Sequence, residues 1–376
     1  TSCFWGDDMP LWKHTAVFAK SFARKALLAT PPSVRRALGP DFFAHLTPEF
    51  LWLEVTAACP NRCKFCGIGD KIPSGRALTP AQIQTALEDP LFRGLRIVVV
   101  SGGEPTLRPD LEAILASVHR AVPQARIVLS SSAALPDRLV RAARTALELG
   151  VRLDVGVSVD GLGKRHDELR GAPGLFTKVD GALRELRELK REFGSQLRVS
   201  VGMVIADDTA AQVDAVRRYA RGLGAAFNPQ WYNQAAYYDN VGRDRLSARA
   251  ELLRIGKQLE PSILTDFAVR VLEGRAPKAR CTMLFNACLV KSSGDMVPCF
   301  TFWDNSVGNV LKDSPSAIWA SQRARVERKR VMACDGCLNA CGVVWSADPD
   351  YLGRSRFYLR HPRVFVAKLR ERLASA

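Results

Sequence analysis

The sequence lacks several features that would place it in a common class. No apolar run reaches the roughly 18 residues that a membrane-spanning helix requires. The first residues lack the basic, apolar and small-residue order of a secretory signal. No solenoid repeat and no low-complexity tract occurs. We therefore expect a globular, cytoplasmic protein in a reducing compartment, where clustered cysteines favour metal or redox chemistry over disulfides.

The sequence has fewer acidic than basic residues. The chain has 38 Asp and Glu against 54 Lys and Arg, a formal net charge of +16, and much of the basic excess lies near the two ends. This balance suits an anionic partner, or it is an ordinary solvated surface. The basic groups lack the aromatic interleaving of a nucleic-acid reader, so we expect no specific nucleic acid. Peripheral contact with an anionic membrane stays open, because the N-terminal arm is basic and amphipathic.

The pattern from residue 51 onward alternates strands with helices. The predicted strands are 51–56, 96–100, 126–130, 152–159, 197–204 and 226–232. The predicted helices are 80–89, 109–121, 136–149, 175–193 and 209–222, with further helices at 246–259 and 262–273. Such alternation predicts parallel strands joined by right-handed crossovers.

Several of these strands carry polar residues on one face. In LDVGVSVD, the side chains of Leu153, Val155 and Val157 alternate with polar or small ones. A packed barrel interior would be aliphatic, whereas a polar face suits a lumen that holds a polar ligand. The polar lumen residues that we expect are Glu54, Asp154, Asn228, Gln230 and Tyr232. We therefore predict an α/β fold: a partial (β/α)6 barrel of parallel strands with its site at the carboxyl ends of the strands.

The regular repeat stops near residue 240. We divide the chain into a basic helical N-terminal arm (1–48), the barrel (49–240), a linker helix with a small cysteine-rich domain (241–350) and a basic C-terminal helix (351–376).

Three of the ten cysteines follow the first predicted strand directly, in CPNRCKFC. Cys59, Cys63 and Cys66 have no nearby histidine, which is unusual for a closed zinc site, although zinc stays the alternative. An iron–sulfur cluster with three protein ligands would leave one iron open to bind a small molecule.

This Cys-x3-Cys-x2-Cys pattern resembles the radical S-adenosylmethionine (SAM) superfamily, and Phe65 before the third cysteine fits that pattern. The resemblance implies that the three cysteines hold a [4Fe–4S] cluster whose open iron is chelated by SAM. The second strand runs into SGGEP, which is similar to the family's GGEP motif at Gly102, Gly103, Glu104 and Pro105. Adjacent glycines would let the backbone approach the ammonium group of SAM, with Glu104 adding charge complementarity.

The stretch VSVDGLGKRHDELRG, residues 157–171, resembles a signature of members with a SPASM or twitch domain. The resemblance implies that Ser158 and Arg170 hold the methionine carboxylate, since Arg suits a carboxylate through its fork of donors. Asp160 would orient the ribose or the substrate, a catalytic role. Where relatives often have Thr-Asn-Gly after the third strand, this chain has three serines, of which Ser131 is the expected cofactor contact.

The C-terminal cysteines resemble the auxiliary-cluster region of the same enzymes. Six cysteines are too few for two complete cubanes of four thiolates each. We expect one auxiliary [4Fe–4S] cluster, with zinc as the alternative. The ligands that the resemblance implies are Cys281, Cys299, Cys334 and Cys337, with Cys341 as a substitute. Cys288 is then either a buried, inert thiol, an alternative ligand or a catalytic hydrogen-atom donor.

The resemblance implies an enzyme that reductively cleaves SAM to a 5′-deoxyadenosyl radical and abstracts a hydrogen atom from a C–H bond. We expect a small polar substrate, such as a sugar or cyclitol of natural-product biosynthesis, and oxidation or epimerisation as the outcome. The implied electron donor is of flavodoxin or ferredoxin type. Two alternatives stay open: maturation of a ribosomally made peptide, and modification of a lipid-like substrate at a membrane surface.

Overall fold

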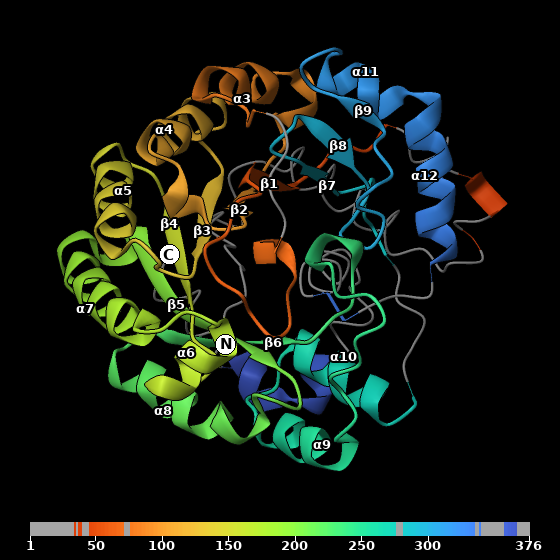
Figure 1. Ribbon diagram of the computed structural model, residues 1–376. Helices are drawn as coiled ribbons and strands as arrows, with labels where there is room; N and C mark the ends of the chain where they lie inside the picture. Colours follow the sequence, from red (N-terminus) through yellow and green to blue (C-terminus); the bar gives the residue numbers. More distant parts are fainter. Residues whose placement is uncertain are drawn as a thin grey trace.

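Six parallel strands form an open arc with helices packed around its outside (Figure 1). The computed structural model describes residues 34, 37–39, 45–70, 76–275, 281–334, 338–339 and 357–366. The strands are β1 (Phe50–Thr56), β2 (Ile97–Gly102), β3 (Arg126–Ser131), β4 (Leu153–Ser158), β5 (Leu197–Ile205) and β6 (Ala226–Trp231). Each pairs with the next in parallel, and β1 does not pair with β6, so the partial barrel predicted from the sequence is confirmed.

The connecting helices also lie where the hydrophobic pattern predicts them. They are α3 (Pro80–Leu87), α4 (Leu111–Ala121), α5 (Pro136–Glu148), α7 (Leu175–Phe193) and α8 (Val213–Gly222), followed by α9 (Arg249–Gln258) and α10 (Ile263–Leu272). Local signals set several ends. Thr79 and Gln82 form a capping box at the start of α3, for example. The helix α8 begins later than predicted because residues 210–212 form a separate 3-10 turn.

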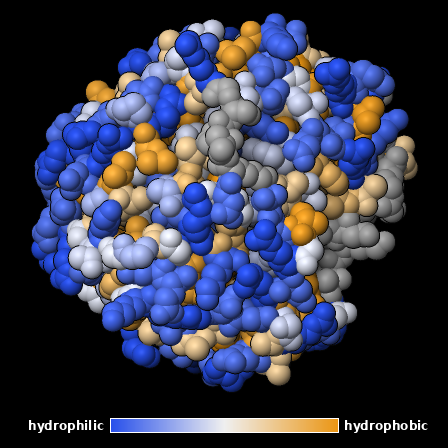
Figure 2. Space-filling view, in the orientation of Figure 1, coloured by the Kyte–Doolittle hydropathy of each residue, from blue (hydrophilic) through white to orange (hydrophobic). Residues whose placement is uncertain are grey.

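The two faces of the arc differ as the alternation predicts. On β4, Leu153, Val155 and Val157 are fully buried against the outer layer, while Asp154 lies on the opposite face. Register between the strands then places Asp154 on the same inner face as Val128 of β3. The outer helices carry mostly hydrophilic side chains on the face seen in Figure 2. The inner face therefore forms a partly polar lumen, and the apolar core lies between strands and helices.

The C-terminal region continues the same sheet. The strand β7 (Ala287–Val290) pairs in parallel with β1, and β8 (Asp295–Val297) and β9 (Gly308–Asn309) add antiparallel strands beyond it. Two helices follow, α11 (Pro315–Ala320) and α12 (Gln322–Ala333). The sequence pattern did not reveal β7, since four residues carry little periodicity.

The two ends of the chain fall mostly outside the described residues, including most of the predicted N-terminal arm. Of the predicted C-terminal helix, residues 357–360 and 362–366 are helical. Among the residues that the structure describes, no helix is long and apolar enough to cross a membrane.

Candidate active site

The loop that follows β1 brings Cys59, Cys63 and Cys66 together at the carboxyl end of the strands. All three side chains are half-buried. The loop folds back on itself, because the Cys66 N–H donates to the Cys63 carbonyl at 3.1 Å. Burial raises the pKa of Cys59 to about 11 and that of Cys66 to about 12, and it raises the pKa of Cys63 as well. These thiols therefore keep their protons until a bound metal stabilises the thiolates.

The three side chains offer thiol sulfurs as metal ligands. Among the described residues, no three His, Cys, Asp or Glu side chains surround one metal position. In a cubane cluster each thiolate binds a different iron, so three cysteines spread along one loop suit it.

Gly102 and Gly103 bring the end of β2 against the cysteine loop. The Gly103 N–H donates to the Thr56 carbonyl and the Glu104 N–H to the Ala58 carbonyl, both at 2.8 Å. A Cβ on Gly102 would lie 2.2 Å from the Thr56 oxygen, and one on Gly103 would lie 2.2 Å from the Ala58 oxygen. The glycines are thus required for contact with the protein's own backbone, a use that the motif did not predict.

Glu104 is fully buried and its carboxylate is occupied by neighbouring groups. One oxygen accepts hydrogen bonds from the N–H and hydroxyl of Thr106 and from the Ser131 hydroxyl, at 2.7–3.0 Å. The other accepts from the N–H and hydroxyl of Ser132, at 2.7 and 2.5 Å. Pro105 begins the 3-10 turn Pro105–Leu107 at this position. Glu104 and Ser131 therefore join the ends of β2 and β3, so both predicted SAM contacts have a structural partner inside the chain.

The HDELRG stretch forms α6 (Lys164–Arg170), whose last residues support the cysteine loop from the other side. The Arg62 N–H donates to the Arg170 carbonyl at 2.9 Å, and the Lys64 N–H donates to the Leu169 carbonyl at 3.0 Å. Gly171 ends the helix with φ +58°, and a Cβ there would lie 2.5 Å from the Arg62 oxygen. The cysteine loop is therefore held between the end of β2 and the end of α6.

Arg170 and Asp160 form a buried ion pair beside the cysteines. The Arg170 Nη2 and Nε lie 2.5 and 2.6 Å from Asp160 Oδ2, and the Val204 N–H donates to Oδ1 at 2.8 Å. Burial alone would lower the pKa of Arg170, but the charges of Asp160 and Cys63 outweigh it and hold that pKa above its usual value. The guanidinium lies 5.3 Å from the Phe65 ring centroid. Arg170 is therefore a cation fixed next to the cysteine site.

The same pair bears on the catalytic role predicted for Asp160. Its side chain is 0% exposed and both oxygens are occupied. Its contacts are with protein groups and not with the lumen. Ser158, by contrast, is half-buried at the end of β4 on the inner face.

Cys288 lies on the wrong face of the sheet for a hydrogen-atom donor. It is fully buried on β7 and pairs in register with Leu51 of β1. Residues in register on neighbouring strands share a face, and the next residue of β1, Trp52, points the other way, toward Tyr237. Cys288 therefore faces the apolar layer beneath the helices, which agrees with an inert thiol.

The predicted auxiliary site is described in part. Cys281, Cys299 and Cys334 are half-buried, whereas Cys337 and Cys341 lie outside the described residues. The Phe302 N–H donates to the Cys299 sulfur at 3.4 Å. Burial raises the pKa of Cys299, and the charge of Cys334 acts in the same direction. Cys334 exerts this effect although it lies 35 positions after Cys299 in the sequence.

The polar lumen residues divide into two groups. Deep in the arc, Arg126 Nη1 lies 2.8 Å from Asp154 Oδ1, and both side chains are buried, as is Asn228. Near the cysteine loop, Glu54 Oε2 accepts hydrogen bonds from the Ser292 N–H and hydroxyl, at 2.9 and 2.8 Å. Burial raises the pKa of Glu54. Gln230 is half-buried on the same inner face of β6.

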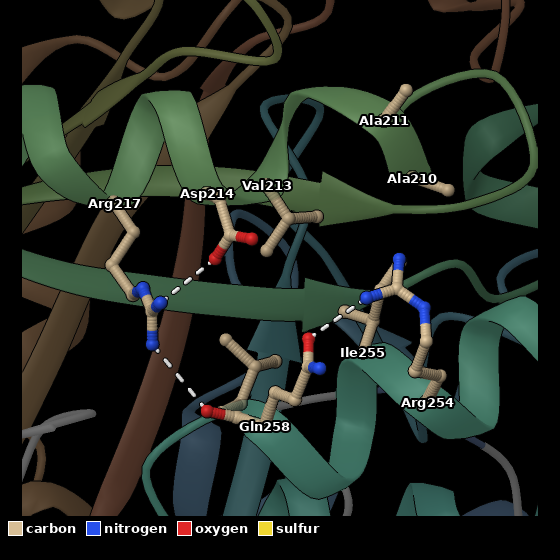
Figure 3. A pocket seen from close by; sticks show the side chains of 9 residues that line it. Ala210, Ala211, Val213, Asp214, Arg217, Arg254, Ile255 and Gln258 are labelled. Carbon is tan, nitrogen blue, oxygen red and sulfur yellow. Dashed lines mark hydrogen bonds and ion pairs between the residues drawn. The ribbon is translucent and has the colours of Figure 1, made fainter.

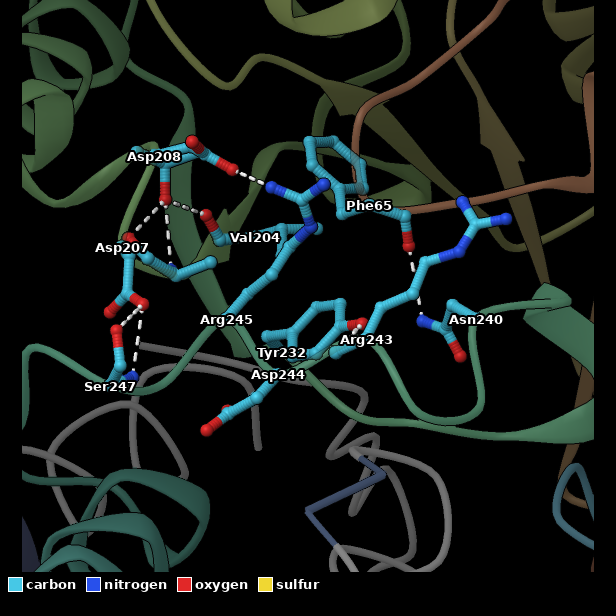
Figure 4. Close-up of polar contacts among 12 residues, drawn as sticks. Phe65, Val204, Asp207, Asp208, Tyr232, Asn240, Arg243, Asp244, Arg245 and Ser247 are labelled. Carbon is cyan, nitrogen blue, oxygen red and sulfur yellow. Dashed lines mark hydrogen bonds and ion pairs between the residues drawn. The ribbon is translucent and has the colours of Figure 1, made fainter.

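The loop after β6 reaches over the cysteine loop, and the sequence pattern gave no sign of this contact. The Tyr232 hydroxyl donates to the Arg243 carbonyl at 2.7 Å, and Asn240 Nδ2 donates to the Phe65 carbonyl at 3.1 Å (Figure 4). Asn240 is 1% exposed. No local motif could have found it, because its partner lies 175 residues away.

A cavity lies away from these groups, between the start of α8 and the helix α9 (Figure 3). Its arginines bond to the protein itself: Arg217 to Asp214 and to the Gln258 carbonyl, and Arg254 to the Gln258 side chain. It is a gap in the helical layer and contributes nothing to the cysteine site.

The fold and the site define a class: partial-barrel proteins with a three-cysteine loop at the carboxyl end of the first strand. Residues 53–220 match the radical SAM superfamily, and residues 281–341 match the SPASM iron–sulfur cluster-binding domain. The two matches together span more than half of the chain, which belongs to the radical SAM superfamily and carries a SPASM domain. These domains bind SAM with a [4Fe–4S] cluster and further iron–sulfur clusters.

Individual relatives differ in what they do. The AdoMet-dependent heme synthase of Methanosarcina barkeri is 24% identical over 310 residues, 75% of this chain and 84% of the relative. The sporulation killing factor maturation protein SkfB of Bacillus subtilis is 24% identical over 321 residues, 79% of this chain and 70% of the relative. Other curated relatives are matched over 34% to 56% of their own length.

Solved structures agree on the fold. Streptococcus suis SuiB bound to its precursor peptide SuiA superposes with a TM-score of 0.58 at 14% identity, covering 87% of this chain and 74% of that one. At this identity the likeness establishes the fold alone.

Proposed function

We propose that this enzyme uses SAM to abstract a hydrogen atom from a substrate held in the lumen. When bound, the cluster and SAM supply the 5′-deoxyadenosyl radical that makes such abstraction possible. The observation that carries this proposal is the fixation of the cysteine loop between Gly103 and Arg170, at the carboxyl ends of the strands. Because the backbone at the end of β2 and the backbone at the end of α6 both hold the cysteine loop, its three cysteines need no further rearrangement.

The chain's own residues have assigned tasks in this proposal. Cys59, Cys63 and Cys66 would hold the cluster, and Arg170, aligned by Asp160, would bind the methionine carboxylate together with Ser158. A guanidinium that already has one carboxylate partner is oriented before its ligand arrives, which lowers the entropy cost of binding. Asp160 then acts as a positioning residue. The auxiliary ligands that we propose are Cys281, Cys299, Cys334 and Cys337, with Cys341 as the substitute.

A small polar substrate suits the inner face. The buried pair Arg126–Asp154 and the buried amide of Asn228 give that face fixed polar groups. Among the described residues, Oε1 of Glu54 accepts no hydrogen bond, while Oε2 is held by Ser292. Oε1 is therefore an acceptor for a substrate hydroxyl or ammonium group.

Peptide maturation is the second candidate. SkfB, matched over most of both chains, is named as a maturation protein, and the SuiB structure contains a precursor peptide. A peptide would enter the same lumen from the carboxyl ends of the strands.

The test begins with anaerobic reconstitution, dithionite reduction and chromatographic detection of 5′-deoxyadenosine and methionine. Cys63→Ala should abolish SAM cleavage, whereas Cys288→Ala, matched in chemistry but buried on the outer face, should retain it. A reduced wild-type protein with a full complement of iron that fails to cleave SAM would refute the proposal.

The same assay in heavy water separates substrates and outcomes. The panel contains aminocyclitols, linear peptides and an iron porphyrin, the last because one relative is a heme synthase. Oxidation gives a product with two hydrogen atoms fewer than the substrate, whereas epimerisation replaces one hydrogen by deuterium and otherwise keeps the formula of the substrate. Stimulation of 5′-deoxyadenosine formation by the peptides alone would replace the small polar substrate by the second candidate. A flavodoxin or ferredoxin replaces dithionite in a parallel arm, to test the proposed donor.

A further inference from the structure

One short segment contacts both cysteine regions. Residues 233–240, here called the bridge segment, follow β6 and contain the 3-10 turn Ala236–Tyr238. Toward the cysteine loop, the Gly67 N–H donates to the Tyr238 carbonyl at 2.7 Å, and Asn240 Nδ2 donates to the Phe65 carbonyl at 3.1 Å (Figure 4). Gly67 and Phe65 flank Cys66 directly.

The other side of the bridge segment bonds to the C-terminal cysteine region. The Tyr237 N–H donates to the Phe300 carbonyl at 3.1 Å, and Phe300 follows Cys299 directly. The Leu338 N–H donates to Asn233 Oδ1 at 3.1 Å, just after the predicted ligand Cys337. The bridge segment therefore joins the residues around both predicted sites by backbone and amide hydrogen bonds.

Tyr237 has a further contact that reaches the glycine motif. Its hydroxyl donates to the Gly102 carbonyl at 2.8 Å, across 135 residues of sequence. The ring is buried against four other aromatic rings, with centroid distances of 5.0 Å to Trp52, 4.6 Å to Trp303, 5.3 Å to Phe300 and 4.9 Å to Tyr238. These contacts fix the ring, so the hydroxyl has one direction in which to donate.

The Gly102 carbonyl and the Gly103 N–H belong to one peptide group, and both ends of that group are bonded. The N–H donates to the Thr56 carbonyl at 2.8 Å, and the carbonyl accepts from Tyr237. Gly102 has φ +144° and no side chain that could restrict this peptide. Without the Tyr237 hydroxyl, this peptide would keep the bond at its N–H end and lose the one at its carbonyl end.

We propose that Tyr237 is a positioning residue for SAM, which holds the Gly102–Gly103 peptide and ties it through the bridge segment to the C-terminal cysteine site. This inference rests on the proposed function, because it takes that peptide to face SAM. The bond that Asn233 makes with Leu338 is then part of the same connection.

Tyr237→Phe tests the positioning role, since it keeps the ring and removes only the hydroxyl. Its matched control is Tyr219→Phe, which removes a hydroxyl bonded to Asp180 Oδ1 at 2.7 Å on the outer helices. In the reconstituted holoenzyme we expect Tyr237→Phe to keep the wild-type iron content and to raise the SAM dissociation constant about threefold to tenfold. The change that SAM causes in the EPR signal of the reduced cluster should also shrink, and Tyr219→Phe should change neither measurement.

Asn233→Ala tests the connection without touching a cysteine. We expect it to raise the SAM dissociation constant less than Tyr237→Phe does, and the double variant to show less than the product of the two effects. A Tyr237→Phe protein with wild-type SAM affinity and EPR response would overturn the positioning role. Multiplicative effects in the double variant would overturn the connection. If the wild-type holoenzyme does not bind SAM, the proposed function itself fails, which is a different result from either.

Discussion

Replacing Asp160 by Asn separates a positioning role from a catalytic one. In the wild type the carboxylate accepts two hydrogen bonds from Arg170 and one from the Val204 N–H, and it is 0% exposed. An Asn side chain can keep the bond to Val204, but it leaves the Arg170 guanidinium buried without its counter-charge.

The expected cost follows from that burial. Removing one partner of a buried ion pair typically costs about 3–5 kcal/mol, and the retained bond places this variant near about 3 kcal/mol. Unfolding entropy is about 2 cal/mol/K per residue, so for 376 residues such a loss lowers the melting temperature by about 4 °C. Arg170 also carries the carbonyl that holds Arg62 in the cysteine loop, so we expect a lower iron content as well.

The matched control is Glu192→Gln. Glu192 also accepts two hydrogen bonds from an arginine, Arg144, one on each carboxylate oxygen at 2.9 Å, but about half of each side chain is exposed. Because solvent-exposed ion pairs contribute little to stability, this variant should melt close to the wild type. Differential scanning calorimetry under anaerobic conditions measures both. If Asp160→Asn melts like the wild type, keeps its iron and still loses turnover, the positioning role is refuted and Asp160 acts on the substrate.

Three further predictions follow from single contacts. Gly103→Ala places a Cβ 2.2 Å from the Ala58 oxygen and must displace the cysteine loop by about 1 Å, so we expect 5′-deoxyadenosine formation to fall about 100-fold; Gly181→Ala, which meets nothing within 4 Å in α7, should keep full activity. Burial, followed by the neighbouring positive charge of Arg170, lowers the pKa of His166 to about 3. The folded state therefore holds His166 neutral, and stability should fall by up to about 1.4 kcal/mol per pH unit below about pH 6.5. Urea unfolding measured at several pH values between neutral and mildly acidic should show that the free energy of unfolding depends less on pH in His166→Asn than in the wild type. Cys288→Ala should leave iron content and turnover unchanged, because that thiol faces the outer layer. A loss of iron would instead show that Cys288 is a ligand, and a loss of turnover alone would show that it is a hydrogen-atom donor.

Much of the barrel could be predicted because its signals are local. The stripe of the helix at 175–193 and the alternation of LDVGVSVD each fall within one element, and the structure has α7 over Leu175–Phe193 and β4 over Leu153–Ser158. The short strand β7 could not be predicted. Its four residues are defined by pairing with β1, more than 230 residues earlier in the chain.

The site divides in the same way. The cysteine triplet, the GGEP motif and HDELRG are contiguous, so each could be recognised and placed at a strand end. The contacts between these motifs could not be predicted. In the structure the two glycines pack against the carbonyls of Thr56 and Ala58, which the motif itself does not indicate. Asn240 and Tyr237 carry no motif, and their bonds to Phe65 and Gly102 appear only after folding.

The sequence by itself determined the class of protein and the order of the strands and helices. Each of these depends on spacing of a few residues, which the chain carries before it folds. Only the tertiary structure decided which face Cys288 occupies, which groups satisfy Glu104 and Asp160, and that the bridge segment joins the two cysteine regions. The reason is physical: a buried polar group must find a partner, and in a parallel sheet that partner comes from strands and loops far away in the sequence.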